Sequence, residues 1–351
     1  MAAAGDARPP GDGRHEVLAE LGEWELIRRL GAFAPPQQFA DDAALLAGSD
    51  ASLVVNTDVL VDGLHFSEAT TTAADVGWRA AAANLSDLAA MGATEVLGLT
   101  VGLVAPPTTP WLWVEGVYQG LSQALTAHGG VILGGDCSGG SQRLLAITAI
   151  GRLDPKAGAI RRADGRPGDL LVSTGCHGLS RLGLALLQRE SITLTTDQPS
   201  PTADSTLGSR AIQAHRRPVP RFDAVVALMD SRPEGTPWRV GGCDSSDGLA
   251  AAVTAIAQAS GCQAHLIKEA LPIDPAMTPI SQAVPWCLEG GEDFELVLAL
   301  DPGWARSLCT VCAGATVIGT LEKGSAGRLC WSNGVPIFPG RPGTPGFRHF
   351  S

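Results

Sequence analysis

The sequence predicts a mixed α/β fold, of the α/β or α+β class, arranged as two domains. Short apolar runs typical of strands alternate along the chain with longer segments whose apolar residues recur at helical spacing. Glycine repeatedly follows those helical segments, as expected where a helix ends. The chain has 351 residues, which is enough for about two ordinary domains.

The first half is expected to contain four strands and two helices. The expected strands are residues 53–57, 96–104, 131–133 and 144–150, and the expected helices are residues 74–91 and 111–128. Gly92 and Gly129 follow the two helical segments and act as stop signals. In this description Asp58 ends the first strand, and Asp136 lies in a glycine turn after the third.

A boundary is expected near Asp154, because residues 151–168 are rich in Gly, Arg and Pro. The predicted parts are a disordered tail (residues 1–16), an N-terminal domain (17–154) and a C-terminal domain (155–351). The C-terminal elements are expected at residues 170–173, 179–189, 222–229, a strand running into Asp244, 249–259, 264–267 and a closing set within 294–338. Residues 191–220 are polar and hold four prolines, which indicates a loop or an insertion.

Composition excludes several classes of protein. The net charge of −11 argues against a nucleic-acid partner. Uncharged apolar stretches of 18 residues are absent, so no membrane span is expected, and the first residues lack the apolar region of a secretory signal. The eight cysteines show no zinc-binding spacing. They are expected to be reduced thiols in a cytoplasmic protein.

The main chemical signal is a set of aspartates at expected turns and in one helix. They are Asp41, Asp42, Asp58, Asp87, Asp136, Asp244 and Asp247. Any one of those at a turn could simply cap a helix or close the turn. Asp87 is different, because it lies among Leu, Ala and Met, where an unpaired carboxylate is costly. Carboxylates that converge repel one another unless divalent cations lie between them, and oxygen ligands favour Mg²⁺ over Zn²⁺.

The usual nucleotide-binding signatures are missing. The sequence has no G-x-x-x-x-G-K-[ST] loop, no G-x-G-x-x-G between a strand and a helix, and no protein-kinase motifs. Any phosphate at Gly134-Gly135-Asp136 would therefore be bound by backbone N–H groups and metal. His65 could be structural or contact a substrate, and Glu292 could face solvent or a ligand. Adjacent Cys176 and His177 do not by themselves indicate a catalytic pair.

Taken together, these motifs resemble the thiamine-monophosphate kinase family, in family order over roughly residues 17–350. The matching strings are Asp41-Asp42-Ala43-Ala44, Asn56-Thr57-Asp58 with His65-Phe66, NLSDLAAMGA at 84–93, Gly134-Gly135-Asp136, Arg162 with Pro167-Gly168-Asp169, DSSDGL at 244–249, GEDFEL at 291–296 and GFRHF at 346–350. The resemblance implies a PurM-like fold of two α/β domains, whose N-terminal domains pair in a homodimer. It also implies transfer of the γ-phosphoryl group of ATP to thiamine monophosphate, giving thiamine diphosphate.

The resemblance also implies roles for individual residues. Mg²⁺ ligands are expected at Asp41, Asn56, Thr57, Asp58, Asp87, Asp136, Asp244 and Asp247. ATP contacts are expected at Gly135, Asp136, Arg162, Ser246 and Tyr118, and thiamine monophosphate contacts at His65, Glu292 and Phe347. Among these, Asp87, Asp136, Arg162 and Asp247 are expected to be catalytic.

The expected chemistry needs no general base, because a phosphate acceptor is already ionised near neutral pH. Positioning and charge neutralisation should suffice for direct in-line transfer. Alternatives are aminoimidazole ribonucleotide synthetase, selenophosphate synthetase, a hydrogenase-maturation dehydratase and a nucleotide-binding protein without activity. Selenophosphate synthetase should carry an N-terminal Cys near a Lys motif, yet residues 1–40 contain neither residue type. The maturation protein should end in Cys, whereas this chain ends in Ser351.

Overall fold

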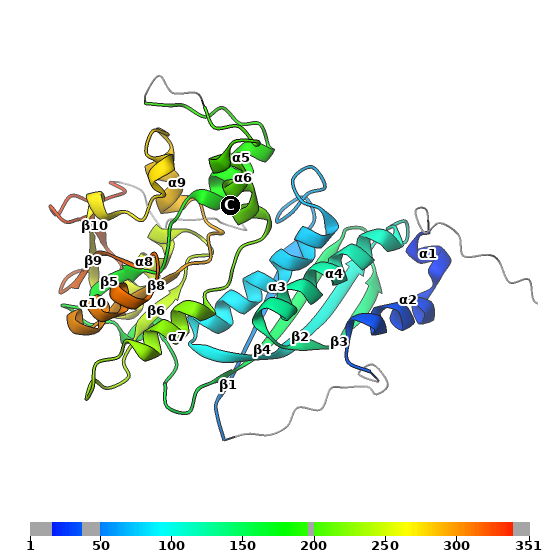
Figure 1. Ribbon diagram of the computed structural model, residues 1–351, viewed down its shortest axis with the longest axis horizontal. Coiled ribbons are helices and arrows are strands. Elements are labelled where there is room, and N and C mark those ends of the chain that lie inside the picture. The colour runs from blue at the N-terminus through cyan, green and yellow to red at the C-terminus, as the bar shows by residue number, and fades with distance from the viewer. Residues whose placement is uncertain (1–15, 37–49, 196–199, 340–351) are drawn as a thin grey trace, which may run out of the picture.

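The chain forms two β-sheets that lie side by side, each with its own helices, in the computed structural model (Figure 1). The structure describes residues 16–36, 50–195 and 200–339. The first sheet has four strands and the second has six. None of the described helices is long and apolar enough to cross a membrane.

The first sheet has the strand order β1-β4-β2-β3. Its strands are β1 (Leu53–Val61), β2 (Ala93–Ala105), β3 (Val131–Gly139) and β4 (Leu144–Leu153). β4 is antiparallel to β1 and to β2, whereas β2 and β3 are parallel. A parallel pair needs a long crossover, and α4 (Trp111–His128) supplies it.

Two helices cover one face of this sheet, α3 (Ala73–Ala90) and α4 (Figure 1). α3 begins at a capping box, in which the Thr72 side chain accepts a hydrogen bond from the Asp75 backbone N–H. Glycines let the two helices approach closely. A Cβ atom on Gly120 would lie 1.9 Å from the carbonyl oxygen of Ala74. The position of α3 therefore depends on the absence of a side chain at this crossing.

The strands of the first sheet alternate between its two faces. Ile147 and Ala149 point toward the helices and are completely buried. On the other face Leu53, Val55 and Val59 are 51%, 60% and 42% exposed. We call this helix-free side the open face. It is apolar, and the described residues leave much of it uncovered.

The second sheet has the order β10-β7-β9-β5-β8-β6, and only β10 and β7 run parallel. Its strands are β5 (Leu170–Ser173), β6 (Gly241–Asp244), β7 (Gln263–Leu266), β8 (Leu296–Leu300), β9 (Thr316–Glu322) and β10 (Leu329–Trp331). α8 (Leu249–Ala259) packs on one face, and α7 (Phe222–Asp230) and α10 (Pro302–Val311) pack on the other. β8 is consequently buried on both sides.

The remaining elements are short helices. They are α1 (Leu18–Leu21), α2 (Glu23–Leu30), α5 (Leu179–Leu187), α6 (Thr206–Arg216) and α9 (Ala283–Glu289), with 3₁₀ turns at Gly31–Phe33, Arg162–Asp164, Lys268–Ala270 and Pro275–Met277. The predicted boundary at Asp154 falls between the two sheets, and the division into domains stays a prediction. Nearly all of the predicted tail, residues 1–15, lies outside the described residues.

Several expected element bounds were wrong. β1 continues to Val61 and β3 to Gly139, so Asp58 and Asp136 lie inside strands rather than at turns. The reason is that pairing with β4 and β2 continues through polar residues, such as Asp58 opposite Ile147. The segment expected to be a loop contains α6, capped by Ser205. Asp247 does not cap α8, whose N-cap residue is Gly248.

Candidate functional site

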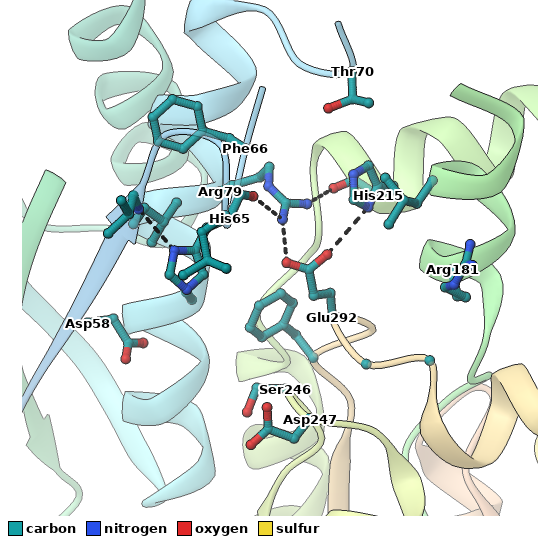
Figure 2. Close-up of a pocket in the computed structure, with 18 of the residues that line it drawn as sticks. Asp58, His65, Phe66, Thr70, Arg79, Arg181, His215, Ser246, Asp247 and Glu292 are labelled. Carbon is teal, nitrogen blue, oxygen red and sulfur yellow. Dashed lines mark hydrogen bonds and ion pairs between the residues drawn. The ribbon is translucent and has the colours of Figure 1, made fainter. Parts of the chain in front are cut away.

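A cavity of about 1230 Å³ lies between α3, the end of β1 and the loops of the second sheet (Figure 2). Seven of the residues predicted from sequence line it. They are Asp58, His65, Asp87, Asp244, Ser246, Asp247 and Glu292. The cavity thus joins side chains from both halves of the chain, which are far apart in sequence.

One end of the cavity is acidic and is lined by Asp58, Asp87, Asp244 and Asp247. We call these residues the acid end, together with Asn56, which does not line the cavity itself but donates a hydrogen bond to Asp87. Asn56 Nδ2 donates to Asp87 Oδ2 at 2.9 Å and to Asn84 Oδ1 at 3.1 Å. Alternation along β1 turns Asn56 and Asp58 toward α3, where the Asp58 backbone N–H also donates to Asn84 Oδ1. Asn84 is thereby the polar link between β1 and α3.

The second half supplies the rest of the acid end. Ser86 Oγ donates to Asp244 Oδ2 at 2.8 Å, which ties α3 to the end of β6. Burial raises the pKa of Asp87 to about 7, and the charges of Asp244 and Asp58 contribute to that rise. Burial likewise raises the pKa of Asp244 to about 6, against the hydrogen bond from Ser86. The carboxylates are therefore close enough to disfavour one another's charge.

The acid end fits a divalent cation by its donor chemistry. Asn56 Oδ1 is buried and has no hydrogen-bond partner in the described structure, an arrangement that a metal ion would satisfy. A cation would also relieve the repulsion between Asp87 and Asp244. Among the described residues, however, no three His, Cys, Asp or Glu side chains already form a metal-binding group.

The structure does not bring every predicted residue to this end. Thr57 points to the open face, where its hydroxyl lies 2.7 Å from that of Thr148. Asp136 is paired with Gly102 on β2, whereas its neighbour Cys137 packs against the helix-side core. Asp136 therefore also faces the open side, and neither it nor Gly135 lines the cavity. Within one chain, therefore, the structure does not bring the side chains of Thr57 and Asp136 to the acid end, and their roles as ligands stay predictions.

Arg162 and Tyr118 lie in contrasting places. Arg162 is close enough to Asp87 and Asp244 for its positive charge to lower the pKa of both carboxyls. Tyr118 is buried in the first core, 5.6 Å from Phe33 between ring centres, and does not line the cavity. Its predicted contact with a nucleotide stays a prediction. Asp41 and Phe347 lie outside the described residues.

The opposite end of the cavity holds His65 and Glu292, and we call it the far end. His65 Nδ1 accepts a hydrogen bond from the Val61 backbone N–H at 2.9 Å, which fixes the ring at the end of β1. Glu292 forms an ion pair with Arg79 of α3, and its Oε2 lies 3.5 Å from His215 Nδ1 (Figure 2). This end therefore presents a half-exposed carboxylate with a fixed direction.

Sequence reasoning missed Arg79 and His215. Both are buried and line the cavity. A signal was present for Arg79, since it is the one charged residue in the apolar run from Val76 to Asn84. A buried arginine needs partners, just as Asp87 does. No comparable local signal marks His215, whose role comes from the packing of α6 against α3 and α5.

The chain is similar to several known proteins. Residues 40–153 match the family model "AIR synthase related protein, N-terminal domain". The chain is 46% identical to thiamine-monophosphate kinase of Synechococcus elongatus over 338 residues, covering 95% of this chain and 98% of that one. It is 44% identical to the Prochlorococcus marinus enzyme of the same name over 322 residues, covering 92% and 94%.

Solved structures extend the likeness to three dimensions. Thiamine-monophosphate kinase from Stenotrophomonas maltophilia matches with a TM-score of 0.70 and 29% identity, covering 89% of this chain and 96% of that one. AaThiL complexed with AMPPCP and TMP matches with a TM-score of 0.69 and 26% identity, covering 95% and 98%. Hydrogenase maturation protein HypE, at 20% identity and a TM-score of 0.70, shares the fold over 91% of this chain and 96% of its own. These matches confirm the expected mixed α/β PurM-like fold, which the structure shows to be built on two sheets.

Proposed function

The chain belongs to the thiamine-monophosphate kinase family, and from that membership we propose that it transfers the γ-phosphoryl group of ATP directly to thiamine monophosphate, using Mg²⁺. It is a thiamine-phosphate kinase with ATP as co-substrate. The identity of 46% to a relative of that name, against 20% to HypE, favours this reaction over the other members of the superfamily. The observation that carries the proposal is one cavity with carboxylates from both halves at one end and Glu292 at the other.

The residues of the acid end would hold Mg²⁺. Asp58, Asp87, Asp244 and Asp247 offer carboxylates, and Asn56 offers an unpaired amide oxygen. Bound Mg²⁺ supplies positive charge that neutralises the phosphate groups of both substrates. Arg162 adds a permanent positive charge beside the same carboxylates, suited to stabilise charge on the transferred group. Ser246, on the loop before α8, is proposed to contact ATP.

The far end would bind the thiamine part. Thiamine is cationic and carries an aminopyrimidine, and the Glu292 carboxylate is suited to either group. His65 lies beside it on the wall formed by the end of β1. The phosphate of thiamine monophosphate would then point toward the acid end. It is already ionised, so no side chain of the cavity has to remove a proton.

We also propose a homodimer formed through the open face. Leu53, Val55 and Val59 make that face apolar, and large exposed apolar patches usually mark interfaces. Packing two open faces together would cover these side chains. It would also bring Asp136, which one chain leaves on that face, next to a second copy. Asp41, Thr57, Gly135, Tyr118 and Phe347 keep their predicted roles within this proposal, as does a cytoplasmic location.

The test of the reaction is to incubate the purified protein with ATP, Mg²⁺ and thiamine monophosphate and detect thiamine diphosphate by ³¹P NMR. Asp87→Asn and Asp247→Asn should each lower kcat by at least about a hundredfold, since charge neutralisation is the main contribution to such transfers. Asp204→Asn, at an exposed position away from the cavity, is the matched control.

Three results would contradict the proposal. If the wild-type protein formed no thiamine diphosphate, the proposed reaction would be refuted. A near-normal kcat in Asp87→Asn or Asp247→Asn would show that the substituted residue is not needed to bind the metal. Direct transfer also predicts inversion of configuration at the γ-phosphorus of chiral ATP, and retention would instead indicate a phosphoenzyme.

A further inference from the structure

We propose that Arg79 is a positioning residue for thiamine monophosphate, acting through Glu292 rather than by contact with the substrate. This inference rests on the proposed function and adds a residue that the family motifs quoted above do not include. It predicts that Arg79 determines how well the thiamine part binds while leaving the binding of ATP alone. Figure 2 shows the arrangement, with Arg79 between His65, His215 and Glu292.

The first support is the set of contacts made by the guanidinium group. Arg79 Nη2 donates to Glu292 Oε1 and, at 3.4 Å, to the carbonyl oxygen of His65. Arg79 Nη1 donates to the carbonyl oxygen of His215. One side chain therefore joins three segments that line the far end of the cavity: the end of β1, the end of α6 and the loop before β8.

The second support is burial. The Arg79 side chain is only 5% exposed, whereas that of Glu292 is 36% exposed. Both terminal nitrogens of Arg79 already have protein acceptors, and its Nε is buried without a hydrogen-bond partner among the described residues, so the group is poorly placed to bind an incoming ligand. Glu292 keeps an accessible carboxylate. Glu292 is therefore the residue that can contact the ligand, and Arg79 fixes the position of Glu292.

The third support is the backbone around Glu292. Glu292 and Phe294 have φ values of +58° and +52°, which are unusual for residues with side chains. Such conformations are energetically costly and persist only when the surroundings fix them. Here the Glu292 N–H donates to the Ser246 carbonyl oxygen at 2.7 Å, and Asp293 accepts from the N–H groups of Gly178 and Ser180. The backbone is held on both sides, and Arg79 fixes the direction of the side chain.

The fourth support is the state of His215. Burial lowers the pKa of His215 to about 4, so the ring is neutral near pH 7. Its Nδ1 also lies 3.2 Å from the hydroxyl of Ser180. The positive charge that pairs with the Glu292 carboxylate is therefore supplied by Arg79. Loss of Arg79 would leave Glu292 free to turn into the cavity opening.

Helical spacing explains why Arg79 serves this end of the cavity. Arg79, Ala83 and Asp87 all line the cavity from one face of α3. Arg79 and Asp87 are eight residues apart, which is roughly 12 Å along a helix axis. That span suits a ligand with its phosphate at the acid end and its ring system at the far end.

The experiment compares KM values for the two substrates in four variants: Arg79→Met, Arg79→Lys, Glu292→Gln and the double variant Arg79→Met/Glu292→Gln. Arg79→Met should raise KM for thiamine monophosphate by about tenfold or more, corresponding to about 1.4 kcal/mol. KM for ATP should change less than about twofold, and Arg79→Lys should recover part of the loss. Adding Arg79→Met to Glu292→Gln should raise KM little further, because the two residues act as one unit.

Arg28→Met is the matched control, since Arg28 forms an ion pair with Glu25 at 2.6 Å and does not line the cavity. Thermal unfolding of each variant shows whether it folds. If Arg79→Met does not fold, the cycle is made with Arg79→Lys, which keeps the charge but not the forked geometry.

Three results would overturn the inference. They are an unchanged KM for thiamine monophosphate in the folded Arg79 variants, an equal rise in KM for both substrates, and fully additive effects in the double variant. Each leaves the proposed function intact, because wild-type turnover is measured first. A wild-type protein that does not phosphorylate thiamine monophosphate would instead refute the proposed function, and the inference with it.

Discussion

Asp87 shows how a single carboxylate can be costly for folding and useful for binding at once. It lies on a mostly apolar helix, is half-buried, and has Asp58 and Asp244 near it. Asn56 Nδ2 donates a hydrogen bond to Asp87 Oδ2 at 2.9 Å, which partly compensates for the burial of the carboxylate. Because its pKa is raised to about 7, Asp87 of the metal-free folded protein keeps its proton at pH values where the unfolded chain would release it.

The pH dependence of stability follows from that shift. The ordinary pKa of an aspartate is 3.8, so between pH 3.8 and about pH 7 the folded state binds more protons at Asp87 than the unfolded state does. As far as Asp87 is concerned, the free energy of unfolding is therefore highest below about pH 4, and it falls as the pH rises through about 7. Metal-free Asp87→Asn should consequently unfold at a Tm a few degrees above that of the wild type at about pH 8, with the difference shrinking toward about pH 4.

Thermal unfolding in EDTA at both pH values measures this. Added Mg²⁺ should raise the Tm of the wild type at the higher pH clearly more than that of Asp87→Asn. A metal-free variant that is less stable than the wild type at the higher pH would show that Asp87 is not under electrostatic strain.

Sequence analysis identified cavity residues that stand out from their neighbours in the sequence. It failed for residues whose position or partners depend on the tertiary structure. Asp87 was recognised because an acid in an apolar helix is conspicuous. Thr57 and Asp136 were grouped with the other ligands through the family resemblance, and the alternation of side chains between the two faces of β1 and β3 was not considered. Arg79 was missed because its partners, Glu292 and the His215 carbonyl, come from the other half of the chain.

At the scale of elements, α3 is the helix on which the cavity depends. It carries Arg79 at the far end, and Asn84, Ser86 and Asp87 at the acid end. The sequence predicted this helix within one residue at either end, since its apolar residues recur at helical spacing and Gly92 marks its end. The sequence did not reveal how closely α4 packs against α3.

Gly120→Ala tests that support. The added methyl group would lie 1.9 Å from the Ala74 carbonyl oxygen and 2.7 Å from the Trp78 nitrogen, so α3 and α4 must move apart. Overpacking of this kind costs about 1–3 kcal/mol. The Tm should fall, and kcat should fall with it because α3 carries residues for both ends of the cavity.

Gly139→Ala is the matched control, because a Cβ atom there would meet nothing within 4 Å. An unchanged Tm and kcat in Gly120→Ala would show that the crossing of the two helices can relax without disturbing the cavity.

At the scale of the whole molecule, the mixed α/β PurM-like fold and the kinase family were both predicted from sequence and are confirmed by the likeness to known proteins. The alternating strands, helices and ordered motifs suffice for that. The open face could not be recognised, because only the structure shows which side of each strand the helices leave uncovered.

The homodimer proposal predicts that Val55→Glu gives a monomer. Val55 is 60% exposed on the open face, and a charge there would be buried without a partner in a face-to-face dimer. Analytical ultracentrifugation should show half the mass of the wild type. Val311→Glu is the matched control, since Val311 is 57% exposed on α10, in the second half. A dimeric Val55→Glu protein, or a monomeric wild type, would contradict the proposal.

The contacts that α3 makes across the molecule have a thermodynamic consequence. Ser86 donates a hydrogen bond to Asp244 at the acid end, and Arg79 pairs with Glu292 at the far end, so that one helix contacts both ends of the cavity where the two substrates are proposed to bind. A small rotation of α3 that improved the fit to one ligand would change the fit to its co-substrate. Any such coupling is reciprocal, so the factor by which nucleotide alters the affinity for thiamine monophosphate must equal the factor in the reverse direction.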